Sequence, residues 1–150
     1  MWRSRYVSLV ILVCGCGGHS NSPIIANDAS VVVTISASAS YVSRVEPVTL
    51  TVTAENRTES RVNFGVGSSS CQLSSLVVVQ GQAAPIAVDR VCTADAMPHR
   101  LAAGERRSES WQWAGAVLVG NERRMLQPGV YEVHGNAGDF QSLPLLVEIR

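Results

Sequence analysis

The residues that could carry out chemistry in this sequence are few, and the densest group lies between positions 89 and 99. It contains Asp89, Cys92, Asp95 and His99, whose side chains can bind metal ions or transfer protons. Carboxylates in a loop next to a cysteine more often cap turns and face solvent. None of the three histidines lies in a recognisable catalytic or metal-binding motif. We therefore expect no catalytic residue and no metal site, with a metal or acid–base site at this group as the alternative.

The charged residues exclude several further functions. All 12 basic residues are arginine, so the chain cannot form a Schiff base, build a lysine-dependent phosphate loop or use a Ser-Lys pair. No G-x-S-x-G sequence is present either. The arginines are balanced by 12 acidic residues without a basic run, which argues against a nucleic-acid partner. We expect no cofactor and no enzymatic activity.

The first residues have the layout of a secretion signal. Arg3 and Arg5 precede an apolar run from Tyr6 to Val13, and small residues follow the run. The run is too short to span a bilayer as a helix. Residues 1–15 are therefore predicted to be a signal peptide that is removed from the exported protein.

The end of the apolar run reads Val13-Cys14-Gly15-Cys16 and resembles the lipobox of bacterial lipoproteins. Cys16 fits the lipidated position better than Cys14, because it follows the small residue Gly15. Residues 16–29 are then the lipidated Cys16 and a polar tether. Ordinary signal cleavage at residues 17–18 is the alternative.

Cys71 and Cys92 are expected to form a disulfide bond. They are the pair that remains of the four cysteines when Cys14 leaves with the signal and Cys16 carries lipid. In the oxidising compartment that a signal predicts, such a pair is normally bonded. Closing a loop of about 20 residues stabilises a domain by roughly 3 kcal/mol in the chain-entropy model. A metal site at these two cysteines is the alternative, but no Cys-x-x-Cys or His-x-x-Cys spacing completes four ligands.

The elements that must position these residues are predicted to be strands. Between residues 48 and 55 apolar side chains alternate with Thr or Glu, which is typical of a strand with one buried face. Turn residues follow at 56–59, so residues 61–66 are predicted to be the returning strand of a hairpin. Further strands are predicted at residues 30–37, 73–80, 86–91, 107–113, 129–134 and 142–149.

This arrangement predicts the fold class. No stretch of ten residues after the signal has the 3.6-residue period of a helix. Short strands separated by Gly, Pro and Ser predict an all-β protein, an immunoglobulin-like β-sandwich of seven or eight antiparallel strands with one disulfide. It would occupy residues 30–150 as a single domain.

Three aromatic residues are predicted to be structural. Trp111 and Trp113 are two residues apart and share one face of a strand, where large rings usually belong to the core. An exposed aromatic platform for a sugar or a peptide is the alternative. Tyr131 follows Pro128 and Gly129 at the start of a late strand, which is the pattern of a tyrosine corner.

Four segments in this order resemble the BsuPI-type domain, a family named for an intracellular proteinase inhibitor. The resemblance implies an immunoglobulin-like fold over residues 48–150 and structural roles for Gly104, Trp113, Pro128, Gly129 and Tyr131. Export and the cysteine pair depart from the cytosolic context of the namesake. The segments that carry the resemblance are Leu50-Thr51-Val52-Thr53-Ala54-Glu55-Asn56, Leu101-Ala102-Ala103-Gly104-Glu105, Trp113-Ala114-Gly115 and Leu126-Gln127-Pro128-Gly129-Val130-Tyr131.

The sequence thus predicts a non-catalytic lipoprotein of the cell envelope, anchored in a membrane by its lipid and binding an envelope protein or polymer. The alternative is an inhibitor of extracytoplasmic proteases, and a hydrolase or metal enzyme is a distant third. Only the family name favours inhibition, because the expected loops at residues 65–70, 81–85 and 114–121 are rich in Gly, Ser and Ala. Tight inhibitors present a rigid loop instead, so we expect no inhibition of general serine proteases at micromolar concentration.

The lipid anchor can be tested directly. We expect Cys16→Ser to release the protein from membranes, because acyl chains contribute about 0.8 kcal/mol per buried methylene and the sequence contains no second anchor. Fractionation followed by immunoblotting measures the effect. A variant that still sediments with membranes would show that Cys16 is not the lipidated residue.

Overall fold

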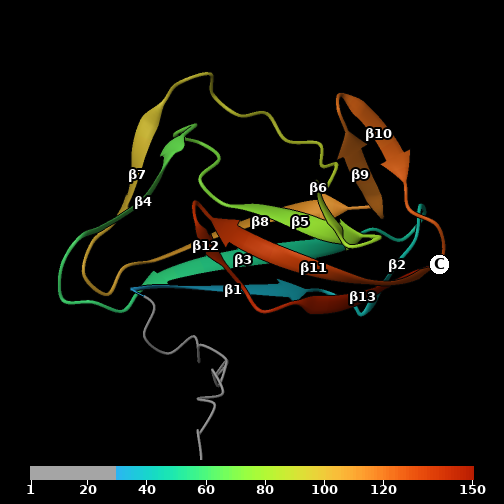
Figure 1. Ribbon diagram of the computed structural model, residues 1–150, viewed down its shortest axis with the longest axis horizontal. Coiled ribbons are helices and arrows are strands. Elements are labelled where there is room, and N and C mark those ends of the chain that lie inside the picture. Colours follow the sequence, from blue (N-terminus) through green and yellow to red (C-terminus); the bar gives the residue numbers. More distant parts are fainter. Residues whose placement is uncertain (1–29) are drawn as a thin grey trace, which may run out of the picture.

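The computed structural model describes residues 30–150 of this protein, so the predicted signal, Cys16 and the tether lie outside the described residues. Every regular element of the described part is a strand (Figure 1). The all-β prediction is confirmed. Within these residues no helix is long and apolar enough to cross a membrane.

One main sheet is antiparallel and has the order β1-β3-β8. The alternation predicted for its central strand is confirmed, because Val48, Leu50, Val52 and Ala54 are buried while the threonines between them are partly exposed. On the outer face Thr51 Oγ1 lies 2.8 Å from Ser110 Oγ in a cross-strand hydrogen bond. The strands are β1 (Val31–Ala37), β3 (Val48–Asn56) and β8 (Arg106–Trp113).

The other main sheet has the order β2-β13-β11-β5-β6, with β12 paired to β11. Its pair β2–β13 is parallel, which corrects the prediction that all strands are antiparallel. The described residues contain 13 strands instead of the predicted seven or eight, because short strands extend the second sheet and others pair outside both main sheets. The strands are β2 (Tyr41–Val42), β5 (Ser74–Val79), β6 (Gln82–Pro85), β11 (Gly129–Ala137), β12 (Phe140–Gln141) and β13 (Leu145–Ile149).

The connectivity of the two main sheets is immunoglobulin-like. The first sheet holds the first, second and fifth strands of that fold as β1, β3 and β8. The second sheet holds the third, sixth and seventh strands as β5, β11 and β13. The core between the sheets contains the fully buried Trp113, Leu50, Leu73 and Leu101.

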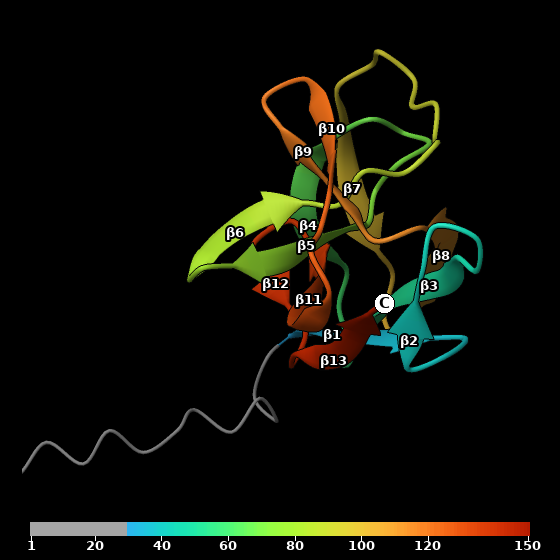
Figure 2. The ribbon, with the colours of Figure 1, turned by 90° about the vertical axis from the view of Figure 1, so that its right-hand side faces the viewer.

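Two strand pairs lie outside the main sheets, on the same side of the sandwich (Figures 1 and 2). One joins β4 (Val62–Gly67) to β7 (Met97–Leu101), and the other joins β9 (Ala116–Val119) to β10 (Glu122–Met125). The predicted hairpin of residues 48–55 with residues 61–66 is therefore wrong. Both edges of β3 are occupied by β1 and β8, so the returning strand has no edge to join.

Asn56 redirects the chain at the end of β3. Its Oδ1 accepts a hydrogen bond from Thr58 N at 2.9 Å, and its Nδ2 donates to Ser60 O at 2.7 Å and to Ala102 O at 2.8 Å. The side chain is fully buried. It therefore holds the predicted turn at residues 56–59 and directs β4 out of the sheet.

The predicted strand at residues 86–91 is also wrong. The strand in this part of the chain is β6 (Gln82–Pro85), and beyond it Ile86 makes a single bridge to Val117. The segment then runs without a strand to Met97. The segments expected as loops at residues 81–85 and 114–121 instead contain β6 and β9.

Trp113 and Tyr131 make the contacts expected of structural residues. Trp113 is buried and its Nε1 donates to Ala116 O at 2.8 Å. Tyr131 Oη donates to Gln127 O at 3.0 Å, which is the tyrosine corner. Pro128 directly precedes β11. Gly129 is the first residue of β11 and pairs with Ile149 on β13.

Gly104 lies in the turn before β8 that the resemblance emphasised. Glu105 Oε2 accepts a hydrogen bond from Ala102 N at 2.7 Å across this turn. That bond is the main reason why the pKa of Glu105 is lowered. The turn at the entry to β8 is therefore fixed by a charged side chain.

The backbone of Gly138, in the turn between β11 and β12, lies in close contact with the backbone of Phe64 on β4. A Cβ atom at this position would lie 1.4 Å from Phe64 O, and the backbone φ is +57°. Gly120, in the β9–β10 turn, has a similar φ of +62° but nothing within 4 Å of its Cβ position. Of these two glycines, Gly138 therefore combines the left-handed backbone with a steric requirement, whereas Gly120 has the backbone conformation alone.

We expect Gly120→Ala to lower the free energy of unfolding by about 1 kcal/mol, the cost of the left-handed backbone. Gly138→Ala should lower it by about 3 kcal/mol or more, because the Phe64 carbonyl must also move. Urea unfolding of both variants measures the difference. Equal effects would show that β4 does not pack on this turn as described.

Candidate functional site

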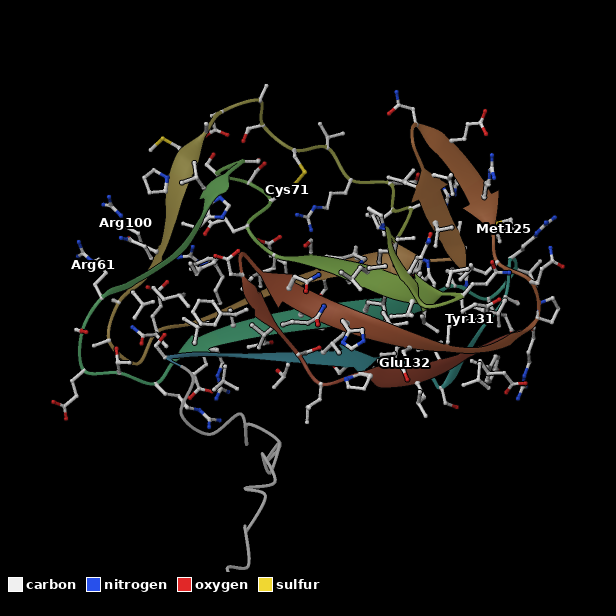
Figure 3. The ribbon with its side chains drawn as sticks, viewed as in Figure 1. Arg61, Cys71, Arg100, Met125, Tyr131 and Glu132 are labelled. Carbon is white, nitrogen blue, oxygen red and sulfur yellow. A yellow bond between two sulfur atoms is a disulfide. The ribbon has the colours of Figure 1, made fainter. Side chains whose placement is uncertain are left out.

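The disulfide-linked segment is the stretch from Ile86 to Ala96, which crosses the open side of the sandwich from β6 to β7 (Figure 1). The predicted disulfide is confirmed, with Cys71 and Cys92 bonded at an S–S distance of 2.01 Å and separated by 21 residues in sequence. Figure 3 shows the sulfur at Cys71 between this segment and the start of β5. The bond therefore fixes the middle of the segment to the sandwich.

Asp95 strengthens the attachment on one side of the disulfide. Its Oδ1 accepts hydrogen bonds from Thr93 Oγ1 and from Ser69 N, the latter at 3.0 Å. These bonds, that of Thr93 first, hold the pKa of the Asp95 carboxyl well below its usual range. Asp95 is therefore a turn cap, as the ordinary interpretation of this loop predicts.

The sequence group that included Asp95 does not form one site. His99 is buried, with its ring centroid 5.4 Å from that of Phe64 and its Nε2 3.0 Å from Ser68 O. Asp89 pairs with Arg123 at 3.0 Å on the exposed surface, and Cys92 is in the disulfide. Within residues 30–150 no group of three or more His, Cys, Asp or Glu residues could hold a metal ion.

Arg90, on the disulfide-linked segment, forms an ion pair with Glu109 on β8. Arg90 Nη2 lies 3.2 Å from Glu109 Oε2 and donates to Leu73 O at 2.9 Å. Its Nε donates to Cys71 Sγ at 2.9 Å, and its guanidinium lies 4.9 Å from the Trp111 ring centroid. The guanidinium therefore joins the disulfide, the start of β5 and β8.

Glu109 uses both carboxylate oxygens. Oε2 faces Arg90, while Oε1 accepts hydrogen bonds from Gln72 N at 2.8 Å and from Leu73 N at 3.2 Å. The side chains of both charged residues are only about one fifth exposed. Such partly buried, charge-assisted bonds are stronger than surface ion pairs.

Beside this ion pair lies a pocket of about 260 Å³ between the two main sheets. Ser75 on β5 and Trp111 on β8 come from opposite sheets, Leu118 comes from β9, and the disulfide-linked segment closes the fourth side. Apolar side chains dominate the wall. The lining residues include Ser75, Ile86, Val88, Arg90, Trp111 and Leu118.

Two polar atoms of the pocket residues have no hydrogen-bond partner within the protein. Among the described residues, Ser75 Oγ and Trp111 Nε1 are the buried side-chain atoms in this condition. Ser75 is 6% exposed and Trp111 is 7% exposed. A buried unpaired donor costs about 1–3 kcal/mol, so native proteins rarely contain one without a reason. The indole of Trp113 on the same strand is by contrast fully bonded.

The prediction that Trp111 and Trp113 belong to the core is confirmed by their burial. The roles of Ser75, Arg90 and Glu109 were not predicted from the sequence. One signal was present, because Glu109 shares the inward face of β8 with Trp111 in the period-two pattern. An acidic residue on a core-facing position requires a charged partner.

No protein-family model and no curated protein matches this chain. Solved structures with partial likeness include a β-glucosidase from Erythrobacter marinus, at 10% identity and TM-score 0.49 over 81% of this chain and 15% of that chain. An alkylpurine DNA glycosylase from Pseudomonas fluorescens is 14% identical, with TM-score 0.49 over 81% of this chain and 31% of that chain. A β-glucosidase from Listeria innocua is 15% identical, with TM-score 0.46 over 79% of this chain and 16% of that chain. The chain thus spans less than a third of each of these proteins.

We expect Glu109→Ala to lower the free energy of unfolding by about 3 kcal/mol, because it leaves Arg90 and two backbone N–H groups without their partner. Glu122→Ala is the matched control. The Glu122–Arg124 pair has the same 3.2 Å separation, but the Glu122 side chain is 74% exposed, so its loss should cost less than about 1 kcal/mol. Equal destabilisation in urea unfolding would contradict the role assigned to Glu109.

Proposed function

We propose that this protein is a non-catalytic binding module of the bacterial cell envelope, anchored through lipid on Cys16, that binds a partner protein at the disulfide face. The disulfide face comprises the pocket of Trp111, the residues Arg90–Cys92 and Leu118 on β9. The observation that carries the proposal is the pair of buried polar atoms without a protein partner on Ser75 and Trp111, two residues that line this pocket. Unpaired donors at a concave, mostly apolar surface favour a ligand that supplies acceptors.

Exposed apolar side chains on the same face support the proposal. Val91, between two pocket residues, is 97% exposed, and Leu118 and Val119 on β9 are also exposed. Apolar and aromatic groups around a desolvated pocket are typical of the centre of a protein interface.

The charged groups of the disulfide face support binding instead of catalysis. Both oxygens of Glu109 are used by Arg90 and by backbone N–H groups. A carboxylate held in this way orients the chain and is poorly placed to accept a proton from a substrate. We therefore assign Arg90 and Glu109 to positioning the pocket wall.

The disulfide supports an extracytoplasmic location, because such bonds persist in oxidising compartments and are rare in the cytosol. An exported protein with lipid on Cys16 would be held close to a membrane surface. The BsuPI-type resemblance is compatible with this proposal and supports the fold more directly than the partner.

Site-specific photo-crosslinking tests the proposed function. A photoreactive residue at Val91 or Leu118 of the full chain, expressed in the native envelope, should give the same discrete crosslinked protein. The matched controls are Val45 and Leu143, which are 87% and 78% exposed but do not line the pocket. These positions should give no such product.

Crosslinking of equal strength at all four positions, or at none, would contradict a specific disulfide face. The identity of the product separates the proposed function from the alternative. If the crosslinked protein is a protease whose activity falls on binding, inhibition replaces the general binding role. A structural or secretion component supports the proposal.

A further inference from the structure

We infer that the Trp111 pocket binds an extended peptide segment, which inserts one aliphatic side chain and presents a backbone carbonyl to Trp111 Nε1. This inference rests on the proposed binding function and names the chemistry of the ligand. The inference combines the apolar lining of the pocket with the two unpartnered polar atoms on its lining residues Ser75 and Trp111.

The polar atoms require hydrogen-bond acceptors. An indole N–H can only donate, and a serine hydroxyl donates readily to a carbonyl oxygen. The carbonyl groups of a peptide backbone supply such acceptors at regular spacing. Trp111 Nε1 and Ser75 Oγ each have less than 1 Å² of accessible surface, so the side chains around them must shift before an acceptor can reach them.

The electrostatics favour a neutral acceptor over an anion. Arg90 is the charged group of the pocket wall, and its guanidinium already contacts Glu109, Leu73 O and Cys71 Sγ. Its charge is therefore compensated before any ligand arrives. A ligand carboxylate would lose its hydration without gaining a free cation, whereas an amide carbonyl loses far less.

The size of the pocket favours a single side chain. Its volume of about 260 Å³ lies below the range of roughly 300–1,000 Å³ typical of sites for whole small molecules. Ile86, Val88 and Leu118 provide aliphatic contacts, and the Trp111 ring provides an aromatic one. An aliphatic side chain such as leucine or isoleucine matches this lining.

A second hollow explains why the ligand is extended. A groove of about 440 Å³ between β6 and the β9–β10 pair adjoins the Trp111 pocket at Pro85 and Leu118, which line both. The groove is also lined by Val117 and Val119. The groove also contains the polar side chains of Gln80, Gln82 and Arg124. A segment seated in the pocket therefore continues over the rim into a second site of mixed polarity, as alternate residues of a strand-like peptide do.

The indole N–H signals of the ¹⁵N-labelled full chain provide the test, because Trp113 is an internal control. The probe is N-acetyl-leucine methylamide, which has the aliphatic side chain and two carbonyls. We expect a saturable downfield shift of the Trp111 indole proton with a Kd of about 1 mM. The Trp113 signal should not move, because its proton is already bonded to Ala116 O.

Matched probes and variants make the result specific. N-acetyl-glycine methylamide, which has the carbonyls without the side chain, should bind at least tenfold more weakly. Ser75→Ala should weaken binding of the leucine probe at least threefold while leaving the melting temperature unchanged or raised, because it removes a buried unpaired hydroxyl. Ser108→Ala removes a hydroxyl that bonds Thr53 on the outer face and should not change the affinity.

The inference is overturned by no shift at Trp111 up to about 50 mM probe, by equal shifts at the Trp111 and Trp113 indoles, or by equal binding of the glycine probe. Unchanged affinity in Ser75→Ala, or saturable binding of maltose at Trp111 without the leucine probe, would also overturn it. A crosslink at Val91 without a probe shift would refute the peptide inference and leave the proposed function intact. A probe shift without any crosslink would refute the proposed function.

Discussion

The ion pair between Arg90 and Glu109 joins parts of the chain that the backbone hydrogen bonds of the sheets leave separate. Glu109 lies on β8 of the first sheet, and through Gln72 N and Leu73 N it holds the entry to β5 of the second. Arg90 lies on the disulfide-linked segment and reaches the same carboxylate. The position of that segment, and with it the pocket wall, depends on this contact and on the Cys71–Cys92 bond.

Much of the fold was predictable because its signals are local in sequence. The alternation in β3 is visible within one strand, and the tyrosine corner of Tyr131 is visible within one turn. The disulfide followed from the number of cysteines and from the oxidising compartment that the signal predicts. The pairing of β4 with β7 was not predictable in this way, because β3 has no free edge and the true partner is about 35 residues away in sequence. Gly138 meets Phe64 by the same kind of long-range contact.

The pocket was harder to predict than the fold. Trp111 and Ser75 belong to different sheets, and neither residue type at its own position indicates an unpaired donor. The burial of Trp111 was predicted correctly, but the bonding state of its indole depends on neighbours that only the packed structure defines. Buried polar atoms without a protein partner are costly for a stable domain, which is why the proposed binding function rests on them.

Hydrogen exchange of the Gln72 and Leu73 backbone amides tests most directly whether Glu109 and the disulfide together hold the pocket wall. In the oxidised protein both amides should exchange slowly, because each donates to the partly buried Glu109 carboxylate. After reduction of the Cys71–Cys92 bond their exchange should accelerate at least tenfold, while amides in the centre of β3 keep their protection. Amides at positions 72 and 73 that exchange as fast as those of an unstructured peptide in the oxidised protein would contradict the account.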